Sequence, residues 1–79
     1  MARKSKVDRM LSIYMKLREG HVLDKCNMAL EYNVDERTIQ RDIDDLRCFI
    51  SDYYVAVLGE YYEIEYDRSK LGYVLRKAV

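Results

Sequence analysis

The sequence predicts a mainly α-helical domain with a small β-hairpin at its C-terminal end. Apolar residues recur every three or four positions from Val7 to Val57, which is the period of a helix. After Gly59 they alternate every second residue, which is the period of a strand. The chain has 79 residues, of which 49% are hydrophobic and 35% charged, and it contains no proline. This size and composition favour a single folded domain spanning residues 1–79.

The first helix is expected over about residues 5–19. Its apolar residues fall at spacings of three and four and so share one face: Val7, Met10, Leu11, Tyr14 and Leu17. Gly20 follows, and glycine readily adopts the left-handed backbone that often ends a helix. We expect this apolar face to pack against the rest of the domain.

The second helix is expected over about residues 24–32. Asp24 can cap its first turn, and Asn33, which tolerates a positive φ, can end it. The residues expected on its buried side are Cys26, Met28, Ala29 and Tyr32. The two cysteines, Cys26 and Cys48, are too few and too far apart for a disulfide framework or a metal-ligand pair. We interpret both as reduced, buried thiols.

The third helix is expected from about residue 36, with Asp35 as its N-cap. Its apolar residues lie at spacings of four, three and four and define a buried stripe: Ile39, Ile43, Leu46 and Ile50. No helix-breaking residue appears before Gly59. We therefore expect the helix to continue through Tyr53 and Val57, the alternative being a second helix after a bend.

A two-stranded hairpin is expected over about residues 60–77, around the polar run 67–70. The apolar residues that alternate with polar or small ones are Tyr62, Ile64, Tyr66, Leu71, Tyr73 and Leu75. An isolated hairpin is marginally stable, so this one should pack on the helices. The order helix, helix, short turn, helix, hairpin is that of a winged helix-turn-helix, with three helices and a two-stranded wing.

The third helix also carries a candidate interface for double-stranded DNA. With the apolar stripe turned inward, Arg37, Gln40 and Arg41 face outward from its first two turns. Arginine and glutamine can pair bidentately with guanine and adenine, and Thr38 can reach a phosphate. Asp42 lies beside the buried stripe, so we expect it to pair with a basic side chain of the first helix or with a backbone amide.

Two other basic segments could contact the same DNA. Arg68 and Lys70 lie at the expected hairpin tip, within reach of a minor groove or flanking phosphates. Arg3, Lys4 and Lys6 form a basic N-terminal arm. The formal net charge is zero, from 14 basic and 14 acidic residues, but the charges are segregated along the chain. One face can therefore still be basic.

The runs VDERTIQRDIDDL (34–46) and IEYDRSKLGYVL (64–75) resemble the N-terminal winged helix-turn-helix of bacterial transcriptional regulators of the WYL type, relatives of the DeoR type. This resemblance implies sequence-specific DNA binding. It places Arg37, Thr38, Gln40 and Arg41 on the recognition helix, and Arg68 and Lys70 on the wing. Asn33 and Asp35 stand where the family often has glycine and serine. Such regulators usually continue into an effector-sensing region, whereas this sequence ends at Val79, so we expect either a domain of a longer regulator or a stand-alone protein.

Other functional classes have less support in the sequence. His21 is the only histidine, and no nucleophile or base lies at a readable spacing from it, so we expect no enzyme activity, no cofactor and no metal. No apolar run reaches the roughly 20 residues of a membrane span, and the N-terminus does not resemble a secretory signal. We therefore expect a cytoplasmic, nucleoid-associated protein without a membrane partner.

The main alternative is a winged helix that binds protein instead of DNA. From Cys48 to Leu58 the chain is apolar on more than one face, which exceeds what one buried stripe requires. Either the hairpin or a second copy could cover this surplus. The residues proposed for a homodimer are Tyr53, Tyr54, Val57 and Leu58.

Overall fold

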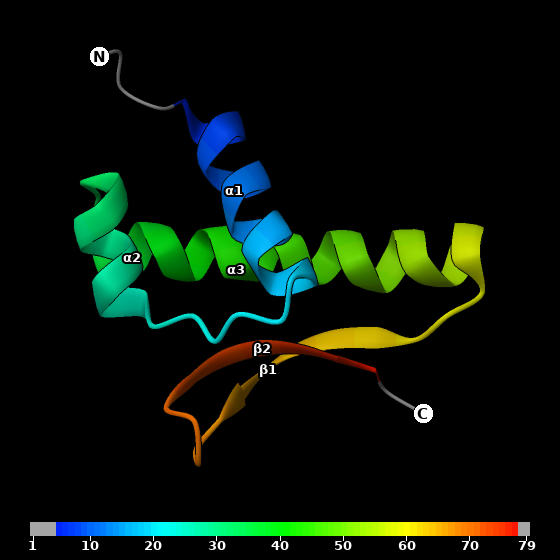
Figure 1. Cartoon of the computed structure of the whole chain (residues 1–79). Coiled ribbons are helices and arrows are strands. Elements are labelled where there is room, and N and C mark those ends of the chain that lie inside the picture. Colours follow the sequence, from blue (N-terminus) through cyan, green and yellow to red (C-terminus); the bar gives the residue numbers. More distant parts are fainter. Residues whose placement is uncertain (1–4, 78–79) are drawn as a thin grey trace.

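The computed structural model describes residues 5–77, which form three helices followed by an antiparallel hairpin (Figure 1). The helices are α1 (Lys6–Arg18), α2 (Lys25–Tyr32) and α3 (Glu36–Tyr53), and α3 continues into a short π-helical turn, η1 (Tyr54–Leu58). The strands are β1 (Tyr62–Asp67) and β2 (Gly72–Lys77). This layout confirms the predicted fold class, and its element order is consistent with a winged helix.

The central element is α3, against which the other elements pack. In Figure 1, α2 crosses α3 near its beginning, α1 crosses it near its middle, and the hairpin runs along its opposite side. Ile39, Ile43 and Ile50 are fully buried, and Leu46 is nearly so. The buried stripe predicted from the spacing of these four residues is therefore confirmed.

Side-chain caps set where the helices begin. Ser5 accepts a hydrogen bond from the amide of Asp8 at 3.1 Å, and Asp24 accepts one from the amide of Cys26 at 2.7 Å. Asp35 does the same for the amide of Thr38 at 2.8 Å. These bonds satisfy amides that have no partner within a helix. The caps predicted at Asp24 and Asp35 are confirmed.

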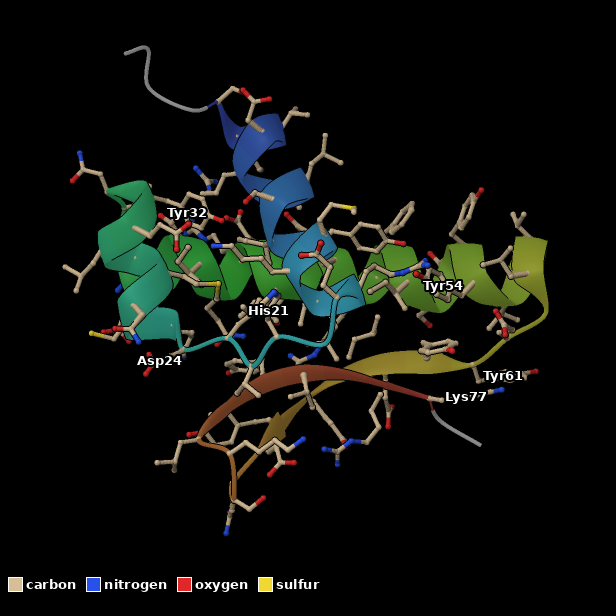
Figure 2. All side chains as sticks on the ribbon, viewed as in Figure 1. His21, Asp24, Tyr32, Tyr54, Tyr61 and Lys77 are labelled. Atoms are coloured by element: carbon tan, nitrogen blue, oxygen red, sulfur yellow. The ribbon has the colours of Figure 1, made fainter. Side chains whose placement is uncertain are left out.

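The end of α3 differs in detail from the prediction. The helix continues without a bend, as expected, but its last turn widens to η1 before Gly59 ends it with φ of 67°. Tyr54, predicted for a dimer surface, is buried, and its hydroxyl lies 2.6 Å from that of Tyr14. It follows Ile50 by four residues, so it extends the buried stripe. Tyr54 is therefore a core residue (Figure 2).

The hairpin is joined to the loop between α1 and α2. Leu23 forms a single antiparallel bridge with Tyr73, through amide-to-carbonyl bonds of 2.9 and 2.7 Å. Gly72 lies against this loop so closely that a Cβ there would stand 2.6 Å from Val22 Cγ1 and 2.8 Å from the Leu23 carbonyl oxygen. This contact, which no local pattern in the sequence predicts, anchors the wing to the helices.

A buried ion pair joins α1 to α3. Arg9 Nε donates to Asp42 Oδ2, and its Nη2 donates to Oδ1 at 3.2 Å. Asp42 is 1% exposed and is the one charged residue buried among residues 5–77. Its hydrogen bond raises the pKa of Arg9. The expectation that Asp42 would pair with a basic side chain of the first helix is confirmed.

Several expectations about burial were wrong. Of the predicted face of α1, Leu17 is buried and Met10 and Tyr14 are partly buried, as expected. Val7 and Leu11 are instead 64% and 57% exposed, and Ile13, which the spacing left out, is fully buried. Cys26 and Cys48 are exposed, free thiols. Cys48 follows Arg37 by eleven residues, which is about three helical turns, so both lie on the outward side of α3. Cys26 lies in the first turn of α2, whose buried residues are Met28, Ala29 and Tyr32.

The ion pair predicts a specific stability effect. We expect Arg9→Met to lower the free energy of unfolding by about 3 kcal/mol, because it leaves the Asp42 carboxylate buried without a partner. The double variant Arg9→Met/Asp42→Leu should recover most of this loss, because it removes both charges. Urea unfolding followed by circular dichroism measures both effects. A loss below about 1 kcal/mol in Arg9→Met would contradict this assignment.

Candidate nucleic-acid interface

The first two turns of α3 present two arginines to solvent. Arg37 and Arg41 are one turn apart and exposed, on the side of the helix opposite the buried isoleucines. Neither has a carboxylate within 4 Å or a side-chain hydrogen bond to residues 5–77. Their guanidinium groups therefore keep all of their donors available to a ligand.

Gln40 is less available than its outward position suggested. It is half-buried, and its Oε1 accepts hydrogen bonds from Lys25 Nζ at 2.9 Å and from the Tyr73 hydroxyl at 3.3 Å. Its Nε2 donates to Asp44 at 3.0 Å. Gln40 thus links α2, α3 and β2. In this arrangement it positions the first turns of α3 relative to the wing.

The tip of the wing is organised by one carboxylate. Asp67 Oδ1 accepts hydrogen bonds from the Ser69 hydroxyl at 2.6 Å, the Ser69 amide at 2.9 Å and the Lys70 amide at 3.1 Å. Its Oδ2 accepts one from Arg76 at 2.6 Å. The Ser69 hydroxyl first, and then Arg76, hold the pKa of Asp67 well below its usual range. The tip is thereby ordered, with Arg68 and Lys70 exposed on it.

The wing tip and the start of α3 lie toward the same end of the molecule. Tyr73, one residue into β2, reaches Gln40 through its hydroxyl, and its ring lies 5.7 Å from the Arg47 guanidinium carbon. Figure 1 shows the hairpin turn directed toward the end at which α2 and α3 meet. The structure therefore brings the two predicted basic segments, on α3 and on the wing, to one end.

Most acidic residues near these segments are paired with other bases. Arg47 binds Asp44 at 3.1 Å, and Arg76 binds both Glu65 and Asp67. Asp35 is engaged in capping α3, and Glu36 is exposed without an ion pair. Within residues 5–77, the bases with neither an ion pair nor a side-chain hydrogen bond are Arg37, Arg41, Arg68, Lys70 and Lys77.

The remaining predicted contacts lie in different settings. Thr38 is half-buried in the first turn of α3. Lys6 is exposed, but its Nζ lies 4.0 Å from Asp45 Oδ2, so its charge is partly balanced. Lys4 and Arg3 lie outside the described residues. The described part of the site therefore consists of α3 and the wing.

The one histidine of the chain lies beside a glutamate. His21 lies on the loop between α1 and α2, and its Nε2 is 3.6 Å from Glu19 Oε1. Residues 5–77 hold no group of three histidine, cysteine, aspartate or glutamate side chains suited to a metal ion. None of the helices described has the length and apolar content needed to cross a bilayer.

Comparison of the chain with protein-family models, with curated proteins and with solved structures finds no significant match.

The wing tip predicts a pH dependence. Because the folded pKa of Asp67 is depressed, the tip should keep its hydrogen bonds above the ordinary carboxyl pKa and lose them as the pH falls through the lowered value. The Ser69 and Lys70 amide shifts, followed by NMR, should titrate with a midpoint well below about 3.9. Ser69→Ala should raise that midpoint, since it removes the largest cause of the shift. A wild-type midpoint at or above about 3.9 would contradict the tip geometry.

Proposed function

We propose that this chain binds double-stranded DNA as the DNA-binding domain of a transcriptional regulator. In this proposal the N-terminal half of α3 enters the major groove, and the wing contacts the flanking groove or backbone. The observation that carries the proposal is the set of unpaired bases: four of the five lie on the first turns of α3 and on the wing tip. The resemblance of residues 34–46 and 64–75 to WYL-type regulators is in agreement with it.

The two basic segments would have different tasks. Arg37 and Arg41 stand on a rigid helix, and such side chains can pair bidentately with the O6 and N7 of guanine. Arg68 and Lys70 stand on a loop tip that Asp67 orders, where they would neutralise phosphates without reading sequence. Gln40 would contribute indirectly, because its hydrogen bonds hold α3 and β2 together. On this proposal the protein acts in the cytoplasm, on the nucleoid.

The first experiment needs no knowledge of a preferred site. Fluorescence anisotropy with a pool of random duplexes, over a series of salt concentrations, should show binding that weakens as salt rises. On random duplexes Arg37 and Arg41 would meet phosphates, as would Arg68 and Lys70. Four contacts at about 0.9 each give a slope of log affinity against log salt near three to four. Undetectable binding at low salt would overturn the proposal and favour a protein-binding winged helix.

Two substitutions separate the wing from the far end of the hairpin. Lys70→Ala should weaken binding to all duplexes alike and reduce the salt slope by about 1. The matched control is Lys77→Ala, since Lys77 is also exposed and unpaired but lies at the other end of the hairpin (Figure 2). Equal losses in the two variants would show that the wing tip has no special role.

Arg41 is expected to contribute specificity. Once a preferred site has been selected from the random pool, Arg41→Ala should weaken that site by about 1–3 kcal/mol and relax preference at one base pair. Its affinity for a scrambled duplex should fall much less. The same loss on matched and scrambled duplexes would reassign Arg41 to a phosphate contact.

A further inference from the structure

An exposed apolar face extends over α1 and the C-terminal half of α3. On α1 it consists of Val7, Leu11 and Met15, which are spaced by four residues and lie on one side. On α3 and η1 it continues with Phe49, Tyr53 and Val57 at the same spacing. Each of these six side chains is between 45% and 64% exposed. We call this surface the α1–α3 face.

The α1–α3 face combines a groove with a ridge. The groove has a volume of about 290 Å³ and an almost entirely apolar lining that includes Leu11, Tyr14 and Phe49. Beside it, the Phe49 ring is stacked on Tyr53 at 5.2 Å and meets Tyr14 edge-on at 6.1 Å. The ridge is thus a packed aromatic cluster, with one side against the protein and the other open.

We propose that the α1–α3 face is the contact surface of a homodimer, covered by a second copy of this chain. A fully buried aromatic side chain covers about 150–250 Å², and valine, leucine and methionine cover somewhat less. Six roughly half-exposed side chains therefore leave on the order of 600 Å² per copy. A two-fold contact would bury about 1,200 Å² in total, which is the lower limit for a stable specific interface. Interfaces at this lower limit are typically weak, so we expect the dimer to form at micromolar and not at nanomolar concentrations.

Features of the face itself favour a second copy. A two-fold contact requires one surface to be complementary to itself, and a groove next to a ridge meets this requirement. Asp45, the acidic residue at the groove, lies 4.0 Å from Lys6, so the edge of the groove has little unbalanced charge to repel an identical copy.

The residues predicted for a homodimer lie in different places. Tyr53 and Val57 belong to the α1–α3 face, whereas Leu58 lies on the hairpin side, near Leu17 and Leu75.

The dimer face is separate from the proposed DNA interface. At 100° per residue, Phe49 and Tyr53 lie about 120° and 160° around the axis of α3 from Arg37, and Val57 follows in the wider turn η1. A second copy bound there leaves Arg37 and Arg41 in solvent. Self-association can therefore be measured without DNA, and its outcome is independent of the proposed function.

Sedimentation equilibrium of the wild-type chain over a range of concentrations tests the dimer. We expect the mass to rise from 9.5 kDa toward twice that value in the micromolar range. Leu11→Glu should weaken association about 100-fold or more, because each substitution acts twice in a two-fold contact. The matched control is Leu30→Glu, since Leu30 is a more exposed leucine on α2, outside the face, and its variant should dimerise like the wild type.

Two results would overturn the proposal. A wild-type chain that stays monomeric up to the millimolar range would show that no second copy covers the face. A dimer that Leu11→Glu and Val57→Glu both leave intact would show that the copies meet elsewhere. Circular dichroism of each variant identifies any unfolding, and because Leu11 and Val57 are largely exposed, both variants should fold.

Discussion

The rotation of α3 about its own axis is the constraint on which the other features of this structure depend. Ile39, Ile43 and Ile50 have no exposed surface, and α1, α2 and β1 all pack on the helix that carries them. Turning α3 by one residue, or about 100°, would bring this apolar surface into water. The isoleucines thus hold Arg37 and Arg41 in solvent on the opposite side, although they do not contact them.

The buried ion pair adds a restraint that apolar packing lacks. The hydrophobic effect that buries the isoleucines is non-directional, so burial alone does not specify which position of α1 meets which position of α3. The two hydrogen bonds from Arg9 to Asp42 fix one position of α1 against one position of α3. Replacing such a pair with apolar residues often costs little stability, so its contribution here is to the geometry of the helices as much as to the free energy of folding.

Local rules explain which parts of the structure could be predicted. The caps at Asp24 and Asp35 and the isoleucine stripe follow from spacing within a few helical turns. The position of Asp42 beside that stripe follows in the same way, although its partner Arg9 lies 33 residues away in sequence. The face that α1 buries does not, because α1 is apolar around a wide arc and its crossing with α3 selects Ile13 over Val7. Similarly, Gln40 is bound by Lys25 and Tyr73, which lie 15 and 33 residues away in sequence. The bridge between Leu23 and Tyr73 is also long-range, so no local pattern indicated it.

The zero net charge of the chain is compatible with a basic interface because the acids are not distributed like the bases. An ion pair such as that of Arg47 with Asp44 acts at a distance as a dipole, whose field falls off faster than that of a single charge. Arg37, Arg41, Arg68 and Lys70 have no such partner, so their fields reach further into solvent before salt screens them. Which side chains are paired therefore sets the sign of the electrostatic potential around the first turns of α3 and the wing tip. The net charge of the sequence does not reveal this sign.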